Sequence, residues 1–194
     1  MQGYGEMGLA AYLIIGYVML IILTVFLGLA EGLQPVFSTF CGTGEVQRSR
    51  ALLRFSLRVV LGVGVLCYVL ILFFARGFIG IFTPGDAELQ AFTYQKSLWY
   101  FSGFFLAGVN ILMISFWQSN RQAGRALPVS LLRSVVLPPL LILVLPAVFG
   151  AGAIWLCHSL SEAATAAVVL VMSGPRRGPA RLKKARTKAG AGQF

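Results

Sequence analysis

A few polar side chains with chemical potential lie inside long apolar stretches of this sequence. Glu31 shares a helical stripe with Thr24 and Gly28, and Glu162 follows His158 by one helical turn. A carboxyl group in such surroundings normally faces a bundle interior or a cavity, where it either exchanges protons or pairs with a cation. Both acids are therefore candidates for a cation pathway, and a buried ion pair is an equally supported interpretation.

Arg133 is the cation best placed to pair with one of these acids. It lies six or seven residues into the apolar stretch 127–149, from where its long side chain can reach Glu31 or Glu162. We predict a contact between Arg133 and Glu162, so Arg133 is the structural ion-pair candidate. For His158 we expect a packing role with a satisfied hydrogen bond.

Further candidates lie on two other apolar stretches. Gln34 precedes Pro35, which removes a backbone hydrogen bond and favours a kink in the first stretch. Asn110 and Met113 could touch a substrate, although packing and an interhelical hydrogen bond are the favoured interpretation. The complete set of candidates for a substrate or cation pathway is Glu31, Gln34, Pro35, Asn110, Met113 and Glu162.

Neither a metal centre nor an enzyme active site is expected. The three cysteines have no CxxC spacing, and the single histidine, His158, cannot supply a metal cluster alone. Paired acids, or a nucleophile beside a base, are not found either. We therefore expect no cofactor and no metal.

The composition defines the elements that must position these residues. Of the 194 residues, 58% are hydrophobic and 11% are charged, and the mean hydropathy is +0.83. A soluble domain is less apolar, and a disordered chain is far less so. We predict an all-α integral membrane protein in which residues 1–172 form five transmembrane helices. The expected spans are about 7–40, 55–82, 97–118, 127–149 and 153–172.

Charge gives the expected orientation. All of the 16 lysines and arginines except Arg76 and Lys96 fall in the first connection, in or near the third, or in the tail 173–194. By the positive-inside rule, the N-terminus lies outside and the tail is cytoplasmic, in a plasma membrane such as the bacterial inner membrane. We expect the basic tail to be disordered and to meet anionic lipid rather than a specific nucleic acid.

Two segments resemble one family. The stretch 28–38, GLAEGLQPVFS, is similar to the eighth helix of multidrug and toxic compound extrusion (MATE) transporters. The stretch 118–127, QSNRQAGRAL, with Arg133, two later prolines and Glu162, is similar to the connection between the family's tenth and eleventh helices and to its last two helices. The resemblance covers most of residues 5–172, in the same order as helices eight to twelve.

The resemblance implies a partial second lobe of a twelve-helix antiporter. Such secondary transporters export cationic or amphipathic drugs and toxic compounds in exchange for H⁺ or Na⁺. The first lobe is not in this sequence, so we expect either a fragment of a longer protein or a chain that pairs with another half. The third span has no Asp or Glu where some members bind sodium, which makes a sodium site here doubtful.

Two other functions stay open. A related carrier of the same superfamily flips lipid-linked sugars, but it should have more cations along its cavity than Arg133. A membrane protein with a structural or assembly role and no transport is the second alternative, because alternating access needs two bundles that rock about a shared site.

Overall fold

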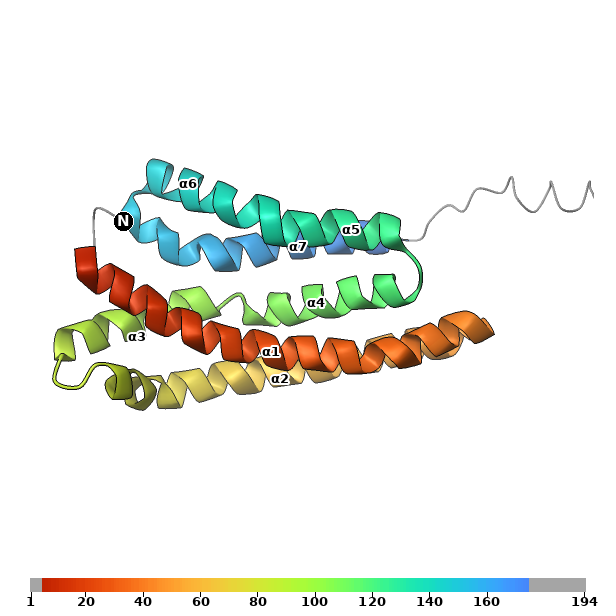
Figure 1. The fold of residues 1–194 in the computed structure, drawn as a ribbon, viewed down its shortest axis with the longest axis horizontal. Helices are drawn as coiled ribbons and strands as arrows, with labels where there is room; N and C mark the ends of the chain where they lie inside the picture. The colour runs from red at the N-terminus through yellow and green to blue at the C-terminus, as the bar shows by residue number, and fades with distance from the viewer. Residues whose placement is uncertain (1–4, 175–194) are drawn as a thin grey trace, which may run out of the picture.

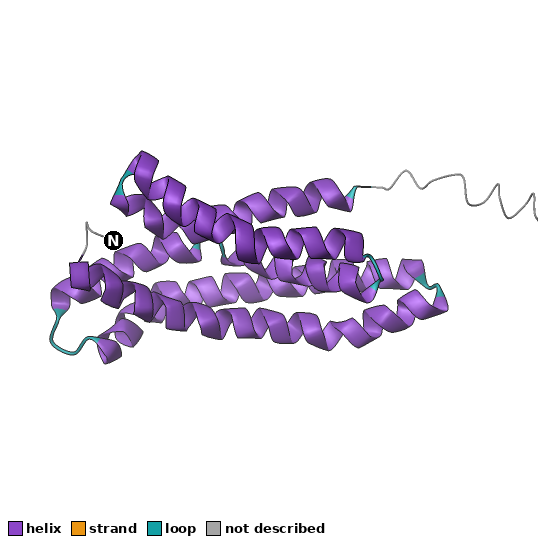
Figure 2. Cartoon of the chain, turned by 45° about the horizontal axis from the view of Figure 1, so that its top comes forward, coloured by secondary structure: helices purple, strands orange, loops and turns teal. Residues whose placement is uncertain are grey.

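The chain folds into helices that run lengthwise through one bundle (Figure 1). The computed structural model describes residues 5–174, and these contain helices, turns and loops but no strand (Figure 2). The predicted disorder of the basic tail concerns residues that lie almost wholly outside this range. The elements are α1 (Gly5–Thr43), α2 (Val46–Phe82), α3 (Ala87–Phe101), α4 (Phe104–Ser119), α5 (Ala123–Leu131), a π-helical turn η1 (Leu132–Val136), α6 (Leu137–Phe149), a 3₁₀ turn η2 (Ala151–Leu156) and α7 (Cys157–Ser173).

Four of the helical stretches are long and apolar enough to span a membrane, and a bent pair of helices makes a fifth when it is counted as one span. The continuous ones are α1, α2, Ala123–Phe149 and Ala151–Ser173. The fifth consists of α3 and α4, which meet at an angle of 41°. The third span, expected as one helix over 97–118, therefore begins earlier and breaks in its outer part. The second begins at Val46 rather than near residue 55, and α1 continues through Pro35 to Thr43.

The break between α3 and α4 follows from a close approach to α7. A Cβ atom on Gly103 would lie 2.8 Å from the Cα atom of Ser159, so only glycine fits there. The Ser159 hydroxyl lies 2.9 Å from the carbonyl oxygen of Trp99 and 3.1 Å from that of Tyr100, and the two carbonyls share its single hydrogen. These bonds satisfy carbonyls that the break leaves free, as the membrane interior requires.

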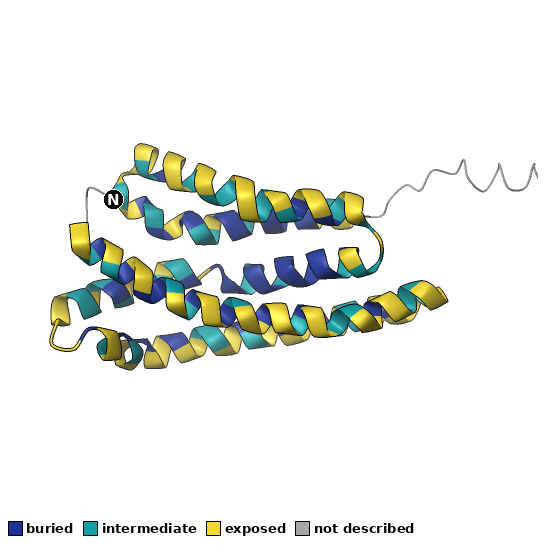
Figure 3. Cartoon of the chain, viewed as in Figure 1, coloured by how far each residue is buried: buried dark blue, intermediate teal, exposed yellow. Residues whose placement is uncertain are grey.

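Helix α4 is the centre of the bundle. It packs against α1 and α2 on one side and against α7 on the other, with α6 outside α7 (Figure 1). Most of α4 is buried, whereas α2 and α6 expose most of their residues (Figure 3). Gly108 allows the closest packing, since a Cβ atom there would lie 2.6 Å from Val60 Cγ1 and 2.8 Å from a ring carbon of Phe26.

The arginine-rich connections share one end of the bundle. The α1–α2 and α4–α5 turns lie at this end together with the last turn of α7 (Figure 1). Arg125 donates to the carbonyl oxygen of Gly174 at 3.4 Å, which ties the α4–α5 side to the end of α7. The α1–α2 hairpin extends beyond the other helices at this end (Figure 1). We refer to it below as the basic end.

Candidate functional site

Arg133 and Glu162 form a two-pronged ion pair inside the bundle. Arg133 Nη2 lies 2.8 Å from Glu162 Oε1, and Arg133 Nε donates to Glu162 Oε2 at 3.1 Å. Glu162 is 3% exposed, so the carboxylate is almost fully removed from the surface. This parallel geometry is the strongest that an arginine and a carboxylate adopt. The contact predicted from the sequence is confirmed.

Asn110 completes the shell of donors around Glu162. Its side chain is fully buried, and its Nδ2 donates to Glu162 Oε2 at 2.8 Å and to the Glu162 carbonyl oxygen at 3.0 Å. The carboxylate thus accepts three hydrogen bonds from two other helical segments. The expectation that Asn110 makes an interhelical hydrogen bond is confirmed, and α4 is locked to α7 at this level.

The backbone around Arg133 is unusual for a physical reason. Pro138 and Pro139 have no N–H, so they cannot donate to the carbonyls four residues before them. The helix responds with the π-helical turn Leu132–Val136, in which the N–H of Leu137 donates to the carbonyl oxygen of Leu132, five residues back. Single π-helical turns occur frequently at functional sites. Here the turn carries Arg133 itself.

The ion pair lines a cavity of about 390 Å³ between α1 and the α6–α7 side of the bundle. Tyr12, Met19 and Leu23 form the α1 wall, and Tyr100 closes it on the α3 side. The polar part of the lining is Arg133, Ser134, His158, Ser161 and Glu162. Most of the lining is thus apolar or aromatic, with charges gathered on one side. Such a lining suits an amphipathic molecule.

His158 is a polar group of this wall, and one nitrogen of its ring has no hydrogen-bond partner among the described residues. Its ring stacks on Tyr100, with 5.0 Å between the centroids and 20° between the planes, which agrees with the packing role. The expected hydrogen bond is not found: Nε2 is buried without a partner among residues 5–174. This stack could not be predicted from the sequence, because Tyr100 lies before the unpredicted break between α3 and α4.

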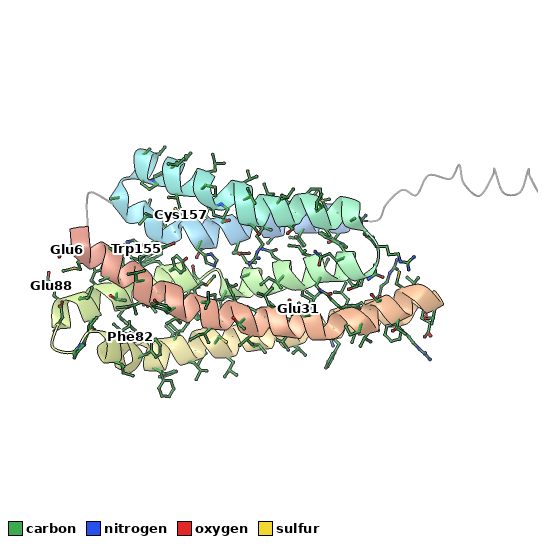
Figure 4. The ribbon with its side chains drawn as sticks, viewed as in Figure 1. Glu6, Glu31, Phe82, Glu88, Trp155 and Cys157 are labelled. Carbon is green, nitrogen blue, oxygen red and sulfur yellow. The ribbon has the colours of Figure 1, made fainter. Side chains whose placement is uncertain are left out.

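The candidates on α1 do not join this cluster. Glu31 is exposed, as are the other members of its stripe, and it has no ion pair within the described part of the chain. Figure 4 shows Glu31 far along the bundle from Cys157 at the start of α7. Gln34 is half-buried and Pro35 is exposed. Neither lines the cavity.

Glu31 and Glu162 also differ in depth, although their distances from the helix ends predicted similar levels. Ser115 donates to the carbonyl oxygen of Ala30 at 3.1 Å, whereas Asn110 bonds to Glu162. Since five residues of α4 separate these donors, Glu31 lies about 8 Å nearer the basic end than Glu162.

Met113 packs away from the cavity. It is 7% exposed and lies in a buried cluster with Trp117 and Val169. This agrees with the packing alternative for Met113. Within the described residues, no group of three or more His, Cys, Asp or Glu could hold a metal ion.

The fold and this site define a multi-pass helical membrane protein with an amphipathic cavity around a buried ion pair. Comparison with known families then shows the family to which the chain belongs. The MatE family model matches residues 1–144, about three quarters of the chain, and the chain belongs to the MatE family of membrane transporters. The match includes Arg133 and Asn110 and ends before Glu162. Neither the curated proteins nor the solved structures that were searched contain a match.

Proposed function

We propose that this chain is the second lobe of a secondary active antiporter that exports cationic or amphipathic compounds in exchange for protons. The observation that carries the proposal is the Arg133–Glu162 pair in the wall of an amphipathic cavity. The chain works with another lobe, since alternating access requires two bundles around a shared site. Its membrane is a plasma membrane, with the basic end on the cytoplasmic side.

The pair offers a simple exchange. With Glu162 ionised, Arg133 and Glu162 together are neutral, and the cavity accepts a cation beside the carboxylate. A proton on Glu162 removes the negative charge and leaves Arg133 as an uncompensated positive charge, which repels a cationic substrate. Proton and substrate therefore exclude each other, and such competition drives antiport.

Protons fit this site better than sodium. A sodium ion needs several oxygen ligands, but both carboxylate oxygens of Glu162 already accept bonds from Arg133 and Asn110. A proton needs only one lone pair. We therefore propose H⁺ as the coupling ion of this lobe.

The proposal is tested by binding of a fluorescent lipophilic cation, ethidium, to the purified chain across a pH series. Because the cation favours ionised Glu162, affinity falls as the pH falls. In Glu162→Gln, affinity is weak and does not vary with pH. Glu88→Gln, at the start of α3 and away from the cavity, is the matched control and behaves as the parent. An unchanged pH profile in Glu162→Gln excludes the coupling role.

A further inference from the structure

Three arginines form a ladder on α2. Arg50, Arg54 and Arg58 follow one another at intervals of four residues, about 6 Å along the helix, and all three are exposed. None of them makes a hydrogen bond or an ion pair with a residue of the range 5–174, whereas Arg48 is paired with Glu45 and Arg133 with Glu162. The ladder is a row of uncompensated positive charges.

The inner part of the ladder points away from the protein. The buried face of α2 includes Ser56, Val60 and Gly64. Arg58 precedes Val60 by two residues and lies about 160° around the helix from it. Phe55 beside the ladder is 61% exposed. In the isolated bundle this face of α2 therefore meets the acyl chains of the bilayer.

Contacts between the helices give the depth of the ladder. Val60 lies opposite Gly108, two residues from Asn110, and Asn110 binds Glu162 near the middle of the span Ala151–Ser173. Val60 is thus close to the midplane. The hydrocarbon core ends about 15 Å from the midplane, or ten residues along a helix, which places its boundary near Arg50.

Arg54 and Arg58 consequently lie about one and two turns inside the core. Their side chains lean toward the N-terminal end of α2, which is the basic end, because Cα–Cβ bonds tilt toward the start of a helix. They can snorkel toward the surface, but an unpaired charge at this depth is still unfavourable. An anion bound beside these arginines removes the energetic cost of their unpaired charges.

We propose that Arg50, Arg54 and Arg58 form a binding site for the phosphate group of an anionic phospholipid. A guanidinium group binds phosphate through two parallel hydrogen bonds. An anionic headgroup is favoured over a zwitterionic one, because α2 contains no acid that could accept a choline or an ammonium group, and Glu45, just before α2, is paired with Arg48. The exposed apolar residues beside the ladder accommodate the acyl chains.

The test measures binding of phosphatidylglycerol and phosphatidylcholine to the purified chain in detergent, by native mass spectrometry and by the rise in unfolding temperature. The parent binds and is stabilised by phosphatidylglycerol in preference to phosphatidylcholine. The triple variant R50Q/R54Q/R58Q binds phosphatidylglycerol at least about tenfold more weakly. The variant R50K/R54K/R58K, which keeps the charge but loses the two-pronged geometry, lies between them.

The matched control removes the same charge from the tail. R176Q/R177Q/R181Q also lowers the net charge by three, and it retains the parent's affinity within about twofold. Equal losses in the two triple variants would show that net charge alone attracts the lipid and would overturn the proposal. The proposal would also be overturned if the parent bound phosphatidylglycerol and phosphatidylcholine equally well. Because the three arginines are exposed, their substitution leaves the packing intact. Should the triple variant fail to fold, the single variants R54Q and R58Q are tested instead, and each should bind phosphatidylglycerol more weakly than the parent.

Discussion

At the scale of single residues, the carboxylate of Glu162 depends on Arg133 for its charge balance. Breaking a buried ion pair by removing one partner destabilises a protein by about 3–5 kcal/mol, because the other charge stays buried without compensation. We predict this loss for Arg133→Ala, measured by thermal or denaturant unfolding in detergent. Replacing both partners in Arg133→Met/Glu162→Leu should recover most of the stability. A stable Arg133→Ala variant would mean that Glu162 is already neutral or hydrated.

Asn110 gives a second prediction at this scale. Asn110→Ala deletes two hydrogen bonds, one of them to the charged carboxylate, and should lower the free energy of unfolding by about 1.5–3 kcal/mol. Its unfolding midpoint is compared with that of Ser119→Ala, a half-buried residue of the same helix whose hydroxyl bonds within the helix. Equal small losses in the two variants would contradict the role of Asn110 as a link between α4 and α7.

The sequence predicted the contact between Arg133 and Glu162, because spans and side-chain reach left few partners for a buried acid, although reach alone also allowed Glu31. It could not place Glu31. Helical spacing correctly puts Thr24, Gly28, Glu31 and Pro35 on one stripe, but spacing does not say which stripe the other helices cover. The missing hydrogen bond of His158 Nε2 could not be predicted either, because it depends on the position of Tyr100.

At the scale of elements, packing of α4 against α1 and α2 depends on Gly108. We predict that Gly108→Ala lowers the free energy of unfolding by about 1–3 kcal/mol, because its methyl group overlaps Val60 and the ring of Phe26. Gly28→Ala is the control: nothing lies within 4 Å of its added Cβ, so better helix propensity should make this variant slightly more stable. The measurement is denaturant unfolding in detergent.

A second substitution that removes the overlap tests whether steric overlap causes the predicted loss of stability in Gly108→Ala. Val60→Ala removes the γ-methyl group nearest to the new Cβ and should restore part of the stability lost in Gly108→Ala, as a double-mutant cycle would show. Additive losses in the cycle would place the strain elsewhere.

The elements could be predicted to the extent that hydropathy defines them. Long apolar runs, separated by arginine-containing loops or by the glycines at 150 and 152, predicted five spans, and the described residues contain four continuous ones plus the bent pair α3 and α4. The helix over 87–97 was missed because it is polar, and the break after Phe101 was missed because no proline marks it. The π-helical turn follows from Pro138 and Pro139, but prolines inside an apolar stretch indicate only that backbone hydrogen bonds are missing there. Whether carbonyls freed by proline produce a kink or a π-helical turn depends on the packing around them.

At the scale of the whole molecule, the distribution of arginines predicts the orientation in the membrane. With Cys41, Cys67 and Cys157 replaced, a cysteine at Pro84 in the α2–α3 turn should react with a membrane-impermeant maleimide added to intact cells. A cysteine at Ala123, at the basic end, should react only after permeabilisation. The opposite pattern of labelling would place the basic end outside.

The central claim is that protons and substrate compete at the Arg133–Glu162 pair. The most direct test is the number of protons released when ethidium binds to the purified chain in weakly buffered solution at a series of pH values. We predict release that rises toward one proton per bound cation as the pH falls through the range in which affinity declines, and none for Glu162→Gln. Binding without proton release at any pH, or equal release from parent and Glu162→Gln, would contradict the claim.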